Sequence, residues 1–185
     1  MKYSINWLES QIENGYQPEY LFFWGHTAKV AGVTDKSCLS QWWPAPFTVD
    51  SVHYPTAEHW MMAKKAMLFN DLEQYQNIIT TDSPAKAKKL GRLVKNFDAT
   101  IWSSNACSFV TEGNLHKFSQ QPSLQDFLLS TGEAVIVEAS PFDKIWGIGT
   151  KAYETDPHKW KGTNLLGFAL MEVRTLLKTN HATTS

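Results

Sequence analysis

The chain has 185 residues, the length of one globular domain, and 43% of them are hydrophobic. Its 17 Lys and Arg nearly balance its 18 Asp and Glu, giving a formal net charge of −1. This balance excludes a general attraction to nucleic acid or membrane, so any contact with a polyanion needs a local basic patch. No stretch predicts a membrane span or signal peptide, and the widely spaced Cys38 and Cys107 read as reduced thiols. We therefore expect a cytoplasmic protein.

Hydrophobic spacing predicts a mainly helical chain with a few short strands. Helices are expected over residues 1–14, 57–69, 71–79, 83–92, 98–113, 122–132 and 164–178. Strands are expected over residues 20–24 and 134–138, with a hairpin formed by 47–49 and 52–54. Because the helices outnumber the strands and do not alternate with them, the pattern favours an α+β fold with a small sheet. We expect a single domain over residues 1–178 and a frayed tail over residues 179–185.

Two segments without regular periodicity lie between these elements. Residues 25–40 are polar and form either a mobile lid over a site or an ordinary surface loop. Residues 140–163 are rich in turn-forming residues.

The helix expected after Tyr54 carries the leading catalytic candidate. Thr56 can cap its start, and the apolar residues that follow cover nearly every side, which is typical of a buried helix. Glu58 and His59 nevertheless lie in its first turn, where a carboxylate faces unpaired backbone N–H groups and the positive end of the helix dipole. Packing alone does not explain a charged acid there, so we expect Glu58 to be catalytic.

Further candidates follow the later elements. Asp143, after the strand at 134–138, is either a second catalytic carboxylate or a turn-former beside Lys144. Trp102 and Trp146 either stack on a flat base or belong to the core, and Gly147 allows a ligand to approach the backbone closely. A basic cluster at Lys86, Lys88, Lys89, Arg92 and Lys95 is either a phosphate site or a solvated helix face. Arg92 is its strongest candidate, since a guanidinium can bind phosphate through two hydrogen bonds.

Several common catalytic motifs are missing from the sequence. It contains no phosphate-binding glycine loop, no G-x-S-x-G nucleophile motif and no H-E-x-x-H zinc motif, because Glu58-His59 lacks the second histidine. We therefore expect neither a metal nor another cofactor.

Taken together, these pieces resemble the YbiA-like family, also called NADAR. The matching segments are Phe22-Phe23-Trp24, Leu39 to Trp42, Phe47 to Asp50, Tyr54 to His59, Ser83 to Arg92, Trp102, Lys117-Phe118, Leu128 to Gly132, Trp146 to Gly149, Gly162 to Gly167 and Leu170 to Arg174. Two departures are Gln41, where the family often has Asn, and Ile148, where one branch has Asp.

The resemblance implies a YbiA-like fold and an N-glycosidase. Its key acid corresponds to Glu58, and Asp143, Trp102 and Trp146 match other site positions. On this reading Arg92, Gly147, Asn164, Phe23 and Trp24 bind substrate. The chemistry agrees with the residues, because breaking a ribosyl C1′–N bond builds positive charge on the sugar that a fixed carboxylate stabilises.

Characterised relatives imply two substrate classes. The expected substrate is a phosphoribosylamino-pyrimidine, an intermediate of riboflavin synthesis. The first alternative is ADP-ribosylated guanine in nucleic acid, as in a repair or antitoxin enzyme, whose activity would depend steeply on salt. The second is a non-catalytic module that binds NAD or ADP-ribose, which would bind tightly without turnover.

Overall fold

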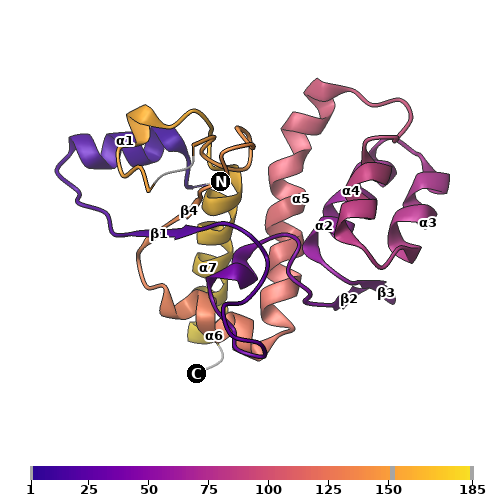
Figure 1. Cartoon of the computed structure of the whole chain (residues 1–185), viewed down its shortest axis with the longest axis horizontal. Coiled ribbons are helices and arrows are strands. Elements are labelled where there is room, and N and C mark those ends of the chain that lie inside the picture. Colours follow the sequence, from indigo (N-terminus) through magenta and orange to yellow (C-terminus); the bar gives the residue numbers. More distant parts are fainter. Residues whose placement is uncertain (1, 151–152, 184–185) are drawn as a thin grey trace. The chain divides into compact units, whose positions relative to one another are not determined.

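The computed structural model describes residues 2–150 and 153–183. The chain packs as two compact units (Figure 1): unit 1 comprises residues 1–40 and 126–185, and unit 2 comprises residues 41–125. The boundary falls within helix α6 (Pro122–Ser130). No helix in the described part of the chain is long and apolar enough to cross a membrane.

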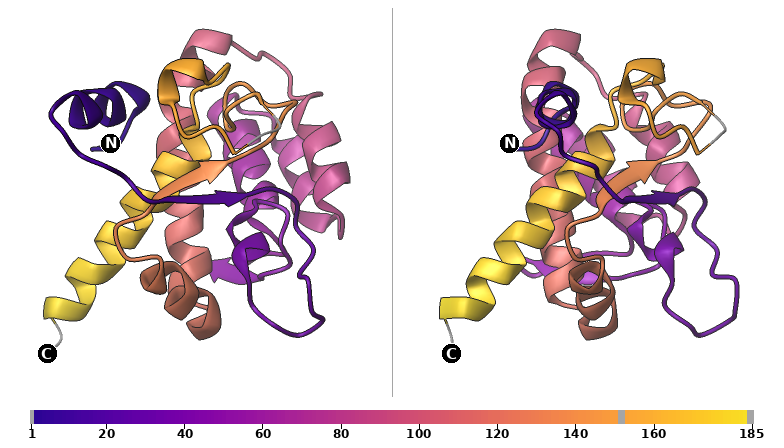
Figure 2. Two further views of the ribbon diagram at one scale, coloured as in Figure 1. Left: turned by 60° about the vertical axis from the view of Figure 1, so that its left-hand side comes forward. Right: turned by 90° about the vertical axis from the view of Figure 1, so that its left-hand side faces the viewer.

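Unit 1 is built on a pair of parallel strands. Its elements are α1 (Ile5–Glu13), β1 (Tyr20–Phe23), the 3₁₀ helix η1 (Lys36–Leu39), β4 (Val135–Glu138), the 3₁₀ helix η2 (Pro157–Lys159) and α7 (Leu165–Thr183). Strands β1 and β4 pair from Tyr20 opposite Val135 to Phe23 opposite Glu138. They lie side by side with the yellow helix α7 against β4 (Figure 2). The carboxyl ends of both strands therefore meet at one edge.

Close backbone contact fixes the start of α7 on β4. Val135, Ile136 and Val137 are fully buried, as expected for a strand covered on both faces. A Cβ added to Gly167 would lie 2.1 Å from the carbonyl oxygen of Ile136. Only glycine lets the first turn of α7 approach the strand this closely.

Unit 2 is a helical cluster with one hairpin. Its elements are β2 (Phe47–Val49), β3 (Val52–Tyr54), α2 (Ala57–Leu68), α3 (Leu72–Thr80), α4 (Pro84–Gly91) and α5 (Ala99–Ser119). Strands β2 and β3 are antiparallel, and their two turn residues, Asp50 and Ser51, have φ angles of 48° and 66°. Two consecutive residues with positive φ are what a tight two-residue hairpin turn requires.

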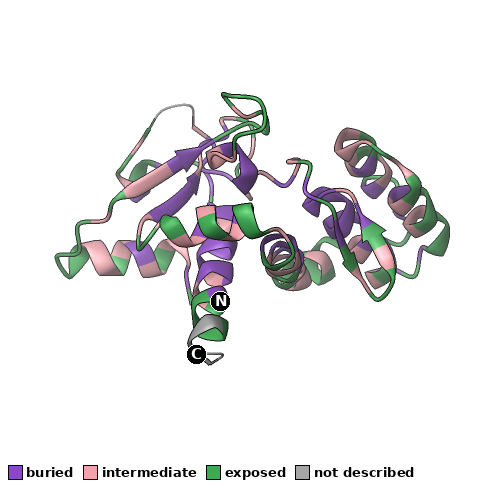
Figure 3. Ribbon diagram, turned by 90° about the horizontal axis from the view of Figure 1, so that it is seen from below, coloured by how far each residue is buried: buried purple, intermediate pink, exposed green. Residues whose placement is uncertain are grey.

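Helix α2 is the core of unit 2 and is buried along most of its length (Figure 3). At its centre Trp60 is 2% exposed, and its indole Nε1–H donates a 2.8 Å hydrogen bond to the carbonyl oxygen of Phe109. A Cβ on Gly113 would lie 2.3 Å from the indole ring, so the glycine makes room for it. Burial over most of the helix surface is therefore observed as predicted, although Met67 in the last turn is 51% exposed.

The α+β fold and most element boundaries predicted from the sequence are confirmed. The predicted caps are present, with side chains of Thr56, Ser83 and Asp98 accepting hydrogen bonds from the first turns of α2, α4 and α5. Helix α5 continues past the expected end at residue 113 to Ser119. Helix α7 continues past residue 178 to Thr183, so the tail expected to fray is helical that far; residues 184–185 lie outside the described residues.

Candidate active site

Glu58 is held in the first turn of α2. The Thr56 side chain caps the helix, and the backbone N–H of Glu58 donates a 3.0 Å hydrogen bond to the carbonyl oxygen of Gln41. Glu58 is only 5% exposed. The start of α2 therefore fixes a buried carboxylate at the positive end of the helix dipole, as the sequence predicted.

His59 reinforces this start as a neutral imidazole. Its Nε2 lies 3.0 Å from the carbonyl oxygen of Thr81, which can only accept, so Nε2 carries the proton. Its Nδ1 lies 2.8 Å from the Thr56 hydroxyl oxygen and accepts a hydrogen bond from that hydroxyl. Burial lowers the pKa of His59, which keeps the ring uncharged. His59 thus supports the turn that carries Glu58.

Lys65 is a further candidate site residue, which the sequence did not single out. It stands seven residues after Glu58, on the same side of α2 and about 10 Å further along the helix axis. Its Nζ lies 4.1 Å from the ring centroid of Phe97 and 5.6 Å from that of Trp102. Burial, followed by the charge of Arg92, lowers the pKa of Lys65. A lysine of this kind has a larger neutral fraction than a surface lysine and suits nucleophilic or basic chemistry.

Arg92 differs from its neighbours in the basic cluster. Lys86 forms an ion pair with Asp82 at 3.6 Å, and Lys95 forms one with Glu73 at 3.0 Å. Arg92 is exposed, caps the end of α4 and makes no ion pair with any described residue. Its guanidinium therefore keeps its donors available for an anion close to Lys65.

Asp143 shapes the loop that follows β4 in unit 1. Its Oδ1 accepts hydrogen bonds from the backbone N–H groups of Ile145, at 2.9 Å, and Trp146, at 2.7 Å. The turn-forming alternative is thereby supported, and the same contacts hold the half-buried Trp146 beside the carboxylate. The other oxygen, Oδ2, has no hydrogen-bond partner among residues 2–150 and 153–183, so this oxygen is available to contact a substrate or water.

Gly147 and Asn164 close this loop at its base. A Cβ on Gly147 would lie 2.9 Å from the carbonyl oxygen of Glu138, so this glycine is required by the chain's own backbone. Asn164 is fully buried; its Oδ1 accepts from the N–H of Glu138, and its Nδ2 donates to the carbonyl oxygen of Ile136, each at 2.9 Å. These contacts give both residues a structural role, and their expected substrate contacts stay predictions.

Phe23 and Trp24 separate at the end of β1. Phe23 is 2% exposed and belongs to the core, whereas Trp24 is 61% exposed and lies 6.3 Å from Phe142, measured between ring centroids. Since β1 and β4 are parallel, Trp24 and the Asp143 loop emerge at the same edge. Trp24 is thus the better placed of the two for a substrate contact.

The structure gathers the predicted residues in two groups, one in each unit. Unit 2 brings Arg92 and Trp102 around Lys65, on the helix that carries Glu58. Unit 1 brings together Asp143, Trp146, Gly147 and Asn164. No group of three or more His, Cys, Asp or Glu that could hold a metal ion occurs among the residues that the structure describes.

Comparison with known proteins finds similarity over most of the chain. The model of the NADAR domain matches residues 22–178. N-glycosidase R617 of Acanthamoeba polyphaga mimivirus is 45% identical over 164 residues, covering 84% of this chain and 95% of that protein. Riboflavin biosynthesis protein PYRR, chloroplastic, of Zea mays is 33% identical over 132 residues, which are 68% of this chain and 20% of that protein.

A solved structure has the same fold. The NMR structure of the E. coli protein YbiA superposes with a TM-score of 0.71 at 27% identity, covering 90% of this chain and 89% of that one. The chain therefore belongs to the NADAR domain family, with the YbiA-like α+β fold expected from its sequence. Its curated relatives identify it as an N-glycosidase, a hydrolase of N-glycosidic bonds.

Proposed function

We propose that the chain hydrolyses the ribosyl C1′–N bond of a phosphoribosylamino-pyrimidine. The observation that carries this proposal is the surface of α2, where buried Glu58 and half-buried Lys65 share one side of the helix. A carboxylate suits the developing sugar cation, the indole of Trp102 suits a flat base, and the guanidinium of Arg92 suits a phosphate. The relative named for riboflavin biosynthesis supports this substrate class.

Glu58 acts on the sugar in this scheme. The C1′–N bond breaks with its electron pair moving to the departing base, and positive charge develops on the ribose. The ionised carboxylate of Glu58 stabilises that charge and orients the attacking water, while burial strengthens the electrostatic attraction. Asp143 stays a second candidate acid, with Oδ2 as the oxygen that the loop does not use.

The groups around Lys65 hold and discriminate the substrate. Trp102 stacks on the flat base, and Arg92 binds the phosphate through its fork of N–H donors. The lowered pKa of Lys65 matters because an ammonium beside the ribose would oppose the developing positive charge. We propose that Lys65 lies on the sugar side of the substrate, where its lowered pKa lessens this opposition.

The basic cluster does not favour a nucleic-acid substrate. Lys86 and Lys95 are already paired with acidic residues, and Lys88 lies 5.9 Å from the ring centroid of Trp42. This leaves little continuous positive surface on α4 for a phosphate backbone. A free nucleotide suits the cluster better.

The test supplies the full chain separately with a phosphoribosylamino-pyrimidine and with ADP-ribosylated guanine DNA, and measures released base by chromatography. We expect base release from the free nucleotide, with a rate that depends weakly on salt. Turnover of the DNA alone, falling steeply as salt rises, would contradict the proposal and favour the nucleic-acid enzyme. Tight binding of either compound without released base would favour the non-catalytic module.

A further inference from the structure

A cavity lies in unit 1, between α1 and the middle of α7. It has a volume of about 230 Å³, and the aromatic side chains of Tyr3, Trp7 and Tyr16 line it together with Met171. Tyr3 and Trp7 pack edge to face, with ring centroids 4.8 Å apart. These rings give the cavity walls suited to a flat apolar group.

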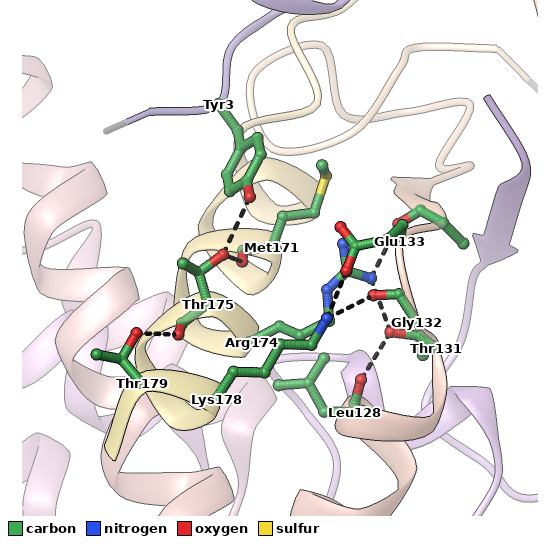
Figure 4. Close-up of polar contacts among 11 residues, drawn as sticks. Tyr3, Leu128, Thr131, Gly132, Glu133, Met171, Arg174, Thr175, Lys178 and Thr179 are labelled. Atoms are coloured by element: carbon green, nitrogen blue, oxygen red, sulfur yellow. Dashed lines mark hydrogen bonds and ion pairs between the residues drawn. The ribbon is translucent and has the colours of Figure 1, made fainter. Parts of the chain in front are cut away.

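Arg174 also lines this cavity and reaches it from α7. Its side chain extends to the turn at Thr131–Glu133, with Lys178 beside it (Figure 4). Its Nη1 donates hydrogen bonds to the Thr131 hydroxyl oxygen, at 2.8 Å, and to the carbonyl oxygen of Ala134, at 2.9 Å. One nitrogen of the guanidinium is therefore committed to the protein's own structure.

The other two nitrogens are uncommitted although the residue is deeply buried. Arg174 is 2% exposed, yet its Nε and Nη2 have no hydrogen-bond partner among the described residues. Burial lowers the pKa of Arg174, so its neighbours do not fully replace the water that the guanidinium has lost. Because Arg174 lines the cavity, its Nε and Nη2 donors are available to a molecule bound there.

The charges around the cavity leave it positive. Lys2 and Arg174 are its cations, and Glu133 is its one acid. The Glu133 side chain is 82% exposed and forms an ion pair with Lys178 at 2.5 Å, so its charge is already compensated. Glu172, which lies between Met171 and Arg174 on α7, accepts a hydrogen bond from the backbone N–H of Lys2. An incoming anion therefore meets more positive than negative charge.

We propose that this cavity is a binding site for a small flat-ring compound carrying one oxyanion group, a carboxylate or a phosphate. The Nε–Nη2 edge of Arg174 presents parallel N–H donors that match two oxygens of such a group. The ring lies among Tyr3, Trp7 and Tyr16. The size fits, since a cavity of about 150 Å³ holds a benzene ring and the remainder accommodates the anionic group. None of the residues that line it belongs to either group of candidate active-site residues.

The experiment titrates the full chain with benzoate, phenyl phosphate, inorganic phosphate and phenol while following the indole N–H signal of Trp7 by NMR. Trp7→Phe identifies that signal. We expect benzoate and phenyl phosphate to shift it with dissociation constants in the millimolar range or below. Inorganic phosphate should bind more weakly because it lacks the ring, and phenol because it lacks the anion.

Substitutions that leave Arg174 in place keep the test independent of folding. Lys2→Ala removes a cation, and Gln11→Trp fills the cavity from α1; each should weaken binding by about tenfold or more. Lys159→Ala is the matched control, because this lysine lies in unit 1 outside the cavity and should leave binding unchanged. A Trp7 signal that no probe moves, or a shift that persists unaltered in Gln11→Trp, would overturn the proposal.

Discussion

The amino group of Lys65 lies 4.1 Å from the centroid of the Phe97 ring, over an apolar surface instead of an acid. No carboxylate forms an ion pair with Lys65 among the described residues. Burial lowers the pKa of this amine, whereas the Phe97 ring attracts its charged form and no acid offsets the effect of burial. Substitutions of Lys65 can therefore test whether its charge, and not only the size of its side chain, matters for activity.

Replacing Lys65 by Met or by Arg should separate an amine from a positive charge. If the neutral amine acts in the reaction, both Lys65→Met and Lys65→Arg lower kcat by about 10²-fold or more, because arginine stays charged. Steady-state rates of base release measure this, with Lys64→Met as the control on the same helix. Near-normal activity of Lys65→Arg would show that only the positive charge matters.

Replacing Glu58 by Gln should abolish base release while the fold is retained. The amide keeps the shape of the side chain but cannot stabilise the developing sugar cation, so we expect kcat to fall by about 10²- to 10⁴-fold. Chromatography of released base and thermal unfolding are the two measurements. Glu112→Gln is the control, since this acid is 44% exposed and pairs with Lys64. Substantial turnover by Glu58→Gln would remove Glu58 from the mechanism.

Asparagine at position 143 should distinguish the two roles of Asp143. An amide oxygen can still accept the N–H groups of Ile145 and Trp146, so Asp143→Asn should keep the loop and its melting temperature. If the carboxylate assists catalysis, kcat falls by about tenfold or more even though the loop is intact. Asp143→Ala should also lose stability. Full activity of Asp143→Asn would leave the residue with a turn-forming role only.

The buried imidazole of His59 should make stability depend on pH. Because burial lowers its pKa below the ordinary 6.5, the unfolded chain binds a proton below pH 6.5 that the folded chain does not. This contribution to stability is present above pH 6.5 and is lost as the pH falls towards the lowered value. Urea unfolding at about pH 7.5 and about pH 5.5 measures the loss.

His59→Gln supplies the comparison for that measurement. The variant should be less stable at neutral pH by roughly 1–2 kcal/mol, because hydrogen bonds to Thr56 and Thr81 are weakened. Its free energy of unfolding should also fall less between the two pH values than that of the unaltered chain. Equal slopes in the two proteins would show that His59 does not titrate in this range.

Local chemistry explains why much of the fold was predictable. Thr56 and Asp98 predict helix starts because a capping side chain accepts a hydrogen bond from a backbone N–H group two or three residues later. Glu58 was recognisable for the same reason, as an acid in the first turn of an apolar helix.

The remaining site features depend on contacts between distant segments. Lys65 looks like an ordinary helical lysine in the sequence. The rings beside it, Phe97 and Trp102, follow it in the sequence only after two further helices, α3 and α4. Asn164 was expected to touch substrate, but its side chain bonds the backbone of β4, 26 and 28 residues earlier. Such pairings leave no periodic signal in a single sequence.

The amide of Asn164 has a consequence for how this family can diversify. The amide joins Glu138, at the end of β4, to the first turn of α7, and so holds together the two ends of the loop over residues 139–163. The length of this loop can therefore change while both of its ends keep their positions. The entropic cost of a longer span grows only slowly with length. Relatives can thereby vary the loop around Asp143 while β4 and α7 keep their packing.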